Sequence, residues 1–144
     1  MPATTETLDD YAATRARLHP DCWVCAPLHD RGLAVRFKAG TNGVVTGEFP
    51  CHEEFVGYPG LLHGGVISAL LDGAMTNCLI ARGTTGLTAR FKVRFLKPVL
   101  IGRPATIRGW WEKSRGAVHV LSADLSQDGQ VLATAAGRFM TYPE

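Results

Sequence analysis

The residue with the strongest chemical signal is Asp72, which stands inside a run of apolar residues of helical length. The segment HGGVISALLDGAMTNCLIA at 63–81 is apolar nearly all round, which predicts a buried helix. An ionised carboxylate is costly in such surroundings, and burial raises its pKa. Asp72 is therefore a candidate catalytic carboxylate. A structural role, in which it bonds to a neighbouring group, is the alternative.

The sequence His63-Gly64-Gly65 stands where a loop gives way to this helix. The first N–H groups of a helix have no intrahelical acceptor, and the helix dipole makes that end positive. Two glycines let a ligand approach the backbone closely. Such a place suits a carbonyl oxygen that gains negative charge during acyl transfer. By themselves, the two glycines also fit a tight turn before a helix.

The spacing between these two features predicts an oligomer. Gly64 and Asp72 are eight residues apart, which corresponds to ~12 Å of helical rise. That distance is too long for both groups to act on one carbonyl within one subunit. We therefore expect the glycine of one subunit to work with the aspartate of another.

Two of the four cysteines, Cys22 and Cys25, form a C-x-x-C motif, which is typical of zinc and redox sites. A zinc site needs further ligands at suitable spacing, and His29, Cys51 and Cys78 do not supply them. A thioredoxin-like site needs a βαβ context, which the sequence does not indicate. The expectation is therefore structural cysteines and no bound metal.

The net charge of +2 is unevenly distributed. The window 82–115 holds nine basic residues and one acidic residue, which suggests an anionic partner such as a phosphorylated cofactor or a nucleic acid. Nucleic acid is disfavoured because aromatic stacking positions are not interleaved with the charges and no binding module is recognised. Strand faces that simply meet water are the alternative. The nine are Arg82, Arg90, Lys92, Arg94, Lys97, Arg103, Arg108, Lys113 and Arg115.

The periodicity of the chain predicts an α+β fold in which one antiparallel sheet wraps one central helix. The hairpin turn between the last two strands is Asp128-Gly129. Helices are predicted at 5–18 and 63–81, and strands at 33–40, 43–49, 87–96, 104–113, 117–126 and 130–141.

The strand at 87–96 alternates strictly between polar and apolar residues. A regular strand sends alternate side chains to opposite faces. On this pattern Thr88 shares one face with Arg90, Lys92 and Arg94, and the apolar residues of the strand occupy the other.

The length of 144 residues indicates one domain, 1–144, with residues 1–20 as an N-terminal helical extension. The N-terminus has no basic region followed by an apolar run, which argues against a secretory signal. Apolar stretches are interrupted before the ~20 residues that a membrane span needs. We expect a cytoplasmic protein without a membrane partner.

Three stretches resemble the PaaI-like group of hotdog-fold thioesterases, and the resemblance covers nearly the whole chain. The most specific is GYPGLLHGGVISALLDGAM at 57–75, with its H-G-G and downstream acid. CWVC at 22–25 with RGL at 31–33 is similar to the usual opening of the group, and TARFKVRFLKP at 88–98 to its long strand with a closing proline.

This resemblance implies hydrolysis of an acyl-CoA thioester in a homodimer, or a homotetramer, with active sites at the interface. Asp72 would be the general base or nucleophile, the Gly64 N–H the oxyanion donor from the other subunit, and His63 an orienting group. Thr88 would position the attacking water. No cofactor is implied, since CoA is part of the substrate. The substrate-binding residues would be Gly65 and, for the CoA phosphates, Arg90, Lys92 and Arg94.

Two positions depart from the pattern of the group. Many relatives carry Asn or Gln seven residues before the first site glycine, where this chain has Gly57. An acidic residue is common directly after the catalytic acid, where this chain has Gly73, so Asp72 is the only carboxylate in 64–81. A hotdog module that binds acyl-CoA without hydrolysing it is the alternative function. A hydratase or dehydratase of the same fold is disfavoured because the sequence has no matching Asp-His motif.

Overall fold

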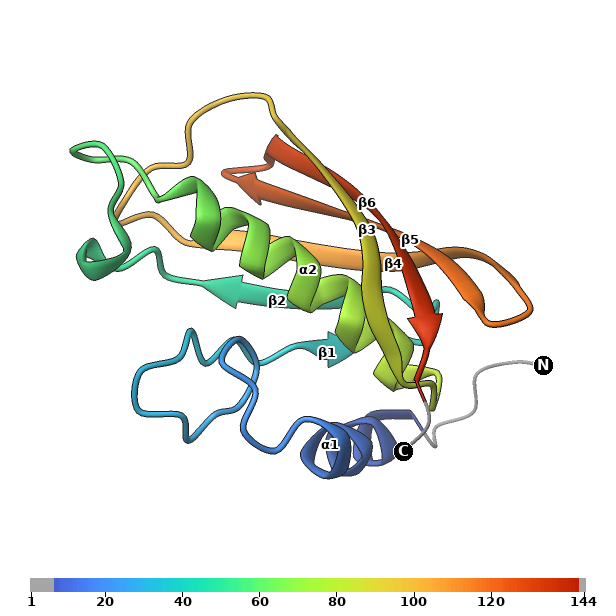
Figure 1. Ribbon diagram of the computed structural model, residues 1–144. Helices are drawn as coiled ribbons and strands as arrows, with labels where there is room; N and C mark the ends of the chain where they lie inside the picture. The colour runs from blue at the N-terminus through green and yellow to red at the C-terminus, as the bar shows by residue number, and fades with distance from the viewer. Residues whose placement is uncertain (1–6, 143–144) are drawn as a thin grey trace.

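The structure, a computed structural model, describes residues 7–142, and side chains from residue 10 onward (Figure 1). The side chain of Leu8, part of the predicted first helix, lies outside the described residues. The elements are α1 Thr7–Leu18, β1 Lys38–Ala39, β2 Val45–Phe49, the 3-10 turn η1 Glu53–Phe55, α2 Gly64–Ala81, β3 Gly86–Phe95, β4 Ala105–Arg115, β5 Val118–Gln127 and β6 Gln130–Thr141.

The six strands form one antiparallel sheet in the order β1-β2-β4-β5-β6-β3, and α2 lies across one of its faces (Figure 1). This arrangement confirms the predicted α+β hotdog fold. The turn at Asp128-Gly129 is also confirmed: both residues have positive φ, and they join β5 to β6. We call the sheet face opposite α2 the outer face.

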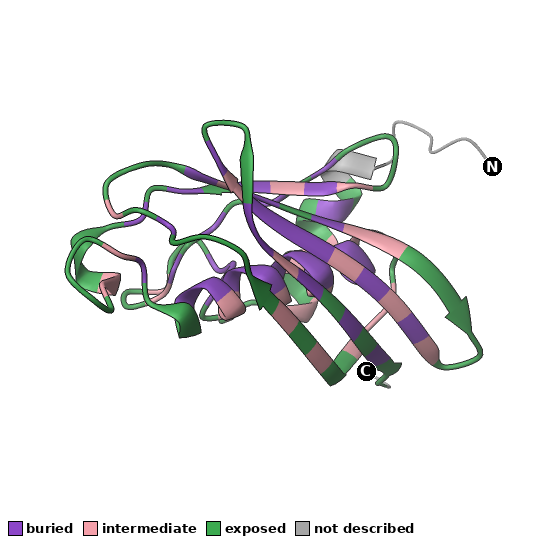
Figure 2. Ribbon diagram, turned by 90° about the horizontal axis from the view of Figure 1, so that it is seen from above, coloured by how far each residue is buried: buried purple, intermediate pink, exposed green. Residues whose placement is uncertain are grey.

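Helix α2 is the core of the molecule, and most of its residues are buried (Figure 2). Two glycines let it approach the sheet closely. A Cβ on Gly109 would lie 2.6 Å from the carbonyl oxygen of Ala74, and one on Gly137 would lie 3.1 Å from the sulfur of Met75. By length and hydropathy alone α2 could cross a membrane, but 67% of it is buried against the rest of the chain, as expected of a core helix.

The flank of α2 away from the sheet is covered by α1 and the segment that follows it. The buried Tyr11 hydroxyl donates to Asn77 Oδ1 at 2.7 Å, and the Asn77 amide donates to the Gly73 carbonyl at 2.8 Å. A Cβ on Gly73 would lie 2.6 Å from Val24 Cγ1. Glycine at position 73 therefore lets residue 24 rest directly on the helix.

The first predicted strand, 33–40, forms only in its last residues, as β1. The burial of its alternate residues is as predicted. The N–H groups of Leu33 and Val35, however, donate to the carbonyls of residues 23–24 rather than to a strand, and Ala34 has a φ of 51°. Pairing with the loop after α1 has replaced pairing with a second strand.

A bulge interrupts the pairing of β3 with β6. Thr88 stands opposite Phe139, but Arg90 stands opposite Arg138, so Ala89 is an extra residue in β3. Phe139 is fully buried on the α2 side of the sheet. Directly paired residues share a face, and an inserted residue reverses the alternation beyond it. The bulge therefore places Thr88 toward α2 and Arg90 on the outer face.

Candidate active site

Asp72 stands halfway along α2, half-buried, and is bonded to Thr88 of β3. The Thr88 hydroxyl donates to Asp72 Oδ1 at 2.7 Å. Burial raises the pKa of Asp72 and is the largest influence; the Thr88 hydrogen bond lowers it, Cys22 raises it, and His19 lowers it. Both residues were singled out from the sequence, and the fold brings them within hydrogen-bond distance.

The basic residues of β3 do not share a face with this pair, which corrects the alternation expected from sequence. Because Ala89 is inserted after Thr88, the exposed side chains of Arg90, Lys92 and Arg94 lie on the outer face. Thr88 alone turns toward Asp72. A bulge is set by the pairing with β6, so the pattern of β3 by itself could not reveal it.

The start of α2 is capped by the imidazole of His63, whose Nδ1 accepts a hydrogen bond from the Gly65 N–H at 2.8 Å. Nδ1 is therefore the unprotonated nitrogen. The Val66 and Ile67 N–H groups donate to the carbonyl of His63. Within the described part of the chain, the Gly64 N–H has no acceptor. The one N–H left for an incoming oxygen thus belongs to Gly64, while that of Gly65 is engaged by His63.

A pocket of about 840 Å³ opens beside this helix end, and we call it the α2-end pocket. It is lined by the loop at 56–63, the first turn of α2 and the segment 95–99. Its walls are mainly apolar, with Lys97 as the lining cation. A Cβ on Gly64 would lie 3.7 Å from the Phe95 ring, an ordinary contact, so packing within the subunit does not require glycine there.

The apolar wall of the pocket was not predicted from the sequence, and Lys97 was named only as one of nine basic residues in the window 82–115. Phe95 is the last residue of β3, and Leu96 and Lys97 follow it directly. These residues form a pocket wall only because the end of β3 lies over the start of α2, and that arrangement is a property of the tertiary structure. The only sign of this wall in the sequence was that two apolar residues and a lysine precede Pro98.

Gly57, one of the departures from the family pattern, lies against the helix cap. A Cβ at this position would lie 3.2 Å from His63 Cα, which is tighter than an ordinary contact. The Gly57 N–H donates to Leu61, and the His63 N–H donates to Phe55, so the loop folds back on itself before α2 begins. A larger side chain would push the His63 backbone away from this fold.

Asp72 does not line the α2-end pocket. The pair Asp72–Thr88 lies instead beside β3, the outermost strand of the sheet. The apolar side chains of Leu87, Phe95 and Leu96 on and after this strand are 57%, 56% and 50% exposed. One chain thus carries the Gly64 N–H and the Asp72 carboxylate at separate places, next to an open sheet edge with apolar side chains.

Comparison with known proteins identifies the family. Residues 59–134, more than half of the chain, match the thioesterase superfamily. A Saccharolobus solfataricus protein whose name describes it as an esterase is 32% identical over 93 residues, which cover 62% of this chain and 66% of that one, just under two thirds.

Two solved structures illustrate the fold. The E. coli PaaI protein from the phenylacetic acid degradation operon superposes with a TM-score of 0.81 at 14% identity, covering 95% of this chain and 96% of that one. A Streptococcus pneumoniae thioesterase crystallised with coenzyme A gives 0.71 at 20% identity, covering 76% and 90%. The chain belongs to the thioesterase superfamily, with the hotdog fold of the PaaI-like proteins.

Proposed function

We propose that this protein hydrolyses acyl-CoA thioesters, with Asp72 as the catalytic carboxylate. The observation that carries the proposal is the hydrogen bond from Thr88 to Asp72, because it fixes a half-buried carboxylate on an otherwise apolar helix. A protein that only bound acyl-CoA would have no use for that carboxylate. Non-catalytic binding is the second candidate.

The catalytic site is proposed to form between two copies of the chain. Pairing along the open edge of β3 would cover Leu87, Phe95 and Leu96 and satisfy the edge of the sheet. It would also allow Asp72 of one copy to meet the Gly64 N–H of the other. Sedimentation should show a dimer or a tetramer at micromolar concentration, and a stable monomer of 15.5 kDa would contradict the shared site.

In the proposed reaction the thioester carbonyl oxygen is held by the Gly64 N–H while the carbonyl carbon is attacked. Either Asp72 takes a proton from a water molecule as that water adds, or its carboxylate adds directly to give an anhydride that water then opens. In both routes the C–S bond breaks, and CoA leaves as a thiol after taking a proton. Thr88 holds Asp72 Oδ1, and the second oxygen, Oδ2, remains to act.

The relatives supply independent support. The pneumococcal thioesterase binds coenzyme A, and variants of it with one aspartate or one threonine replaced by alanine have been crystallised. Those two positions are 16 residues apart, the same separation as that between Asp72 and Thr88. The same two residue types at the same spacing support the assignment of Asp72 and Thr88 to the proposed site.

The CoA phosphates are proposed to meet Lys97 first. This residue lines the α2-end pocket, whereas Arg90, Lys92 and Arg94 lie on the outer face of β3. Those three cations could take part only where the nucleotide passes around the sheet edge. The apolar walls of the pocket suit the acyl or pantetheine chain.

The experiment is a thiol-release assay with acetyl-, hexanoyl-, palmitoyl- and benzoyl-CoA, combined with a variant that removes one N–H. Gly64→Pro removes the N–H, and Pro is favoured at the first helical position. His63, with a ψ of 133°, already has the backbone conformation that is required before proline. Loss of an oxyanion donor should lower kcat by ~10²–10³. Gly64→Ala keeps the N–H and should lose less. Tight CoA binding with no thiol release from any substrate would favour the binding module.

A further inference from the structure

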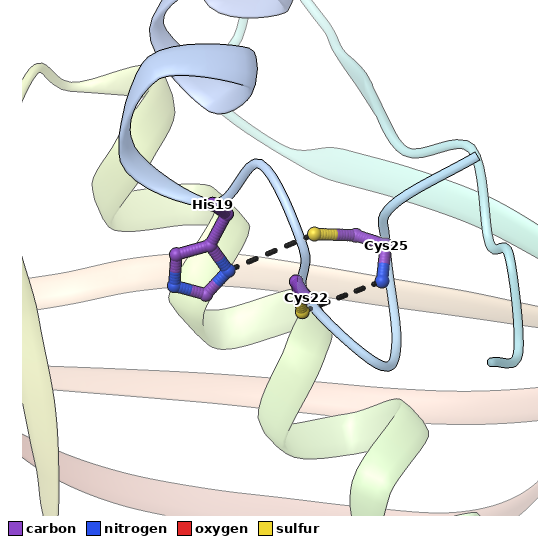
Figure 3. Close-up of side chains that lie close together, drawn as sticks. All are labelled: His19, Cys22 and Cys25. Atoms are coloured by element: carbon purple, nitrogen blue, oxygen red, sulfur yellow. Dashed lines mark hydrogen bonds between the residues drawn. The ribbon is translucent and has the colours of Figure 1, made fainter. Parts of the chain in front are cut away.

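The loop that follows α1 brings three metal-ligating side chains together outside the proposed active site. His19, Cys22 and Cys25 each offer one ligand atom, and these atoms all lie within 4.8 Å of one another (Figure 3). We call residues 19–25 the cysteine loop. Cys25 is buried, and Cys22 and His19 are half-buried. From the sequence, only residues after the C-x-x-C motif, namely His29, Cys51 and Cys78, were considered as further ligands.

The separation of the ligand atoms fits one tetrahedral ion. Bonds of ~2.3 Å to sulfur and ~2.05 Å to imidazole nitrogen, at the tetrahedral angle, place those two atoms about 3.6 Å apart. The observed distance between Cys25 Sγ and His19 Nδ1 is 3.7 Å. The loop thus holds these two ligands at the separation that a tetrahedral ion requires.

The backbone of the cysteine loop is arranged around the sulfur of Cys22. The Cys25 N–H donates to Cys22 Sγ at 3.4 Å (Figure 3). The Ala26 N–H donates to the Cys22 carbonyl. Hydrogen bonding from the Cys25 thiol lowers the pKa of Cys22 most, with further lowering by His19 and by the backbone N–H groups of Val24 and Cys25. The pKa of Cys25 is correspondingly raised, first by Cys22 and then by burial. The two sulfurs thus lie side by side, as two ligands of one ion must.

A fourth group completes the surroundings of Cys25. Arg15 Nη1 lies 3.9 Å from Cys25 Sγ and donates to the His19 carbonyl at 3.0 Å. Side chains that hold metal ligands in place are a regular part of such sites. Arg15 links the helix α1 to both a sulfur ligand and the residue that carries the imidazole.

We propose that His19, Cys22 and Cys25 bind one divalent cation with affinity for thiolate, of which Zn²⁺ is the representative. Two thiolates and an imidazole are the ligand set that zinc prefers. Both sulfurs bind the cation as thiolates, so binding releases the protons that the thiols carry. A solvent molecule takes the fourth position, since Cys22 and His19 are only half-buried. The proposal reverses our expectation of no metal, because His19 had not been counted as a ligand.

The cation would fasten the cysteine loop to α2. Val24, inside the loop, packs on Gly73, and Asn77 lies between Tyr11 of α1 and the same turn of α2. The bound ion would therefore stabilise the contact of α1 and the loop with the core helix, one residue from Asp72. This site does not depend on the proposed thioesterase activity, because its ligands are not the catalytic groups.

A reversible disulfide between Cys22 and Cys25 is the competing explanation, and metal analysis of the full chain separates the two. Protein purified under reducing conditions, with any affinity tag removed, is loaded with Zn²⁺, dialysed and analysed for metal; we expect one ion per chain. Replacement by Co²⁺ should give the thiolate charge-transfer and d–d absorption of a tetrahedral site. Protein that stays metal-free while it forms the disulfide would overturn the proposal.

The matched variants test the ligands one by one. Cys22→Ser and His19→Asn alter half-buried positions, so folding should survive, and circular dichroism checks this. Each should weaken Zn²⁺ binding by more than ~100-fold, since loss of an outer partner alone costs 10- to 100-fold. His29→Gln, in the next turn of the same loop region, is the control and should keep the ion. Equal loss in His29→Gln and His19→Asn would refute the ligand assignment.

Discussion

Replacement of Asp72 by Asn is the most informative perturbation of the proposed mechanism. Asn keeps the shape of the side chain and one oxygen that can still accept from the Thr88 hydroxyl, while it removes the negative charge and the basic oxygen. Asp72 is the only carboxylate on α2, so the described helix holds no substitute for it. The α2-end pocket and the Gly64 N–H are unchanged.

The magnitude follows from the role assigned to Asp72. General-base catalysis is worth ~10²–10⁴ in rate, or about 2.7–5.5 kcal/mol of activation free energy. We expect kcat for the best acyl-CoA substrate to fall by at least ~100-fold, with KM little changed. The assay is thiol release on the same preparation that is used for thermal unfolding. Asp128→Asn is a matched control, because Asp128 is an exposed turn carboxylate whose positive φ Asn accepts readily.

Stability should move in the opposite direction from activity. Burial raises the pKa of Asp72 above the ordinary 3.8, so folding free energy is lost as the pH rises from 3.8, and the full cost is present above the raised pKa. Asn carries no such cost. The melting temperature of Asp72→Asn should therefore equal or exceed that of wild type at neutral pH, and the gap should close below pH 3.8, where both side chains are neutral in both states. A folded Asp72→Asn variant with full turnover, or one that is less stable and fully active per folded molecule, would refute the reasoning.

Three further predictions test neighbouring parts of the structure. Thr88→Val removes the hydrogen bond that lowers the pKa of Asp72, so the acidic limb of the pH–rate profile should move to higher pH. An acidic limb at the wild-type pH would show that Thr88 does not act on the catalytic carboxylate. Raising the ionic strength should increase KM and leave kcat nearly unchanged, and Lys97→Ala should flatten this salt dependence if Lys97 meets the CoA phosphates. Gly73→Ala should lower the free energy of unfolding in urea by about 1–3 kcal/mol, because its Cβ would overlap Val24; recovery in Gly73→Ala with Val24→Ala would confirm the cause.

The elements of the fold were predictable where local pattern and tertiary structure agree. The long apolar run ending at Ala81 forms the buried helix, and the strands from Gly86 to Thr141 appear close to their expected bounds. Their hydrophobic periods fit their surroundings except where a bulge interrupts the pairing, as at Ala89 in β3. The Asp128-Gly129 turn likewise depends on its own two backbone conformations.

The parts that sequence could not supply depend on contacts between distant segments. Leu33 and Val35 alternate like a strand, but their N–H groups find the carbonyls of the cysteine loop instead. His19 becomes a possible ligand only because the chain folds back after α1, which places it against Cys25. The separation of Asp72 from Gly64, by contrast, followed from helical rise alone, since that distance is a local property.

The extra residue in β3 also determines how this strand responds to changes in length. Alternate residues of a strand point to opposite faces of the sheet. The extra residue Ala89 reverses this alternation, or phase, between the first residues of β3 and the rest. Any substitution at Ala89 keeps that phase, whereas deletion of the residue would rotate either Thr88 away from α2 or the cations Arg90, Lys92 and Arg94 onto the apolar core. Along β3, the number of residues is therefore more tightly constrained than the identity of Ala89, and family members that align here without a gap should share the same phase shift.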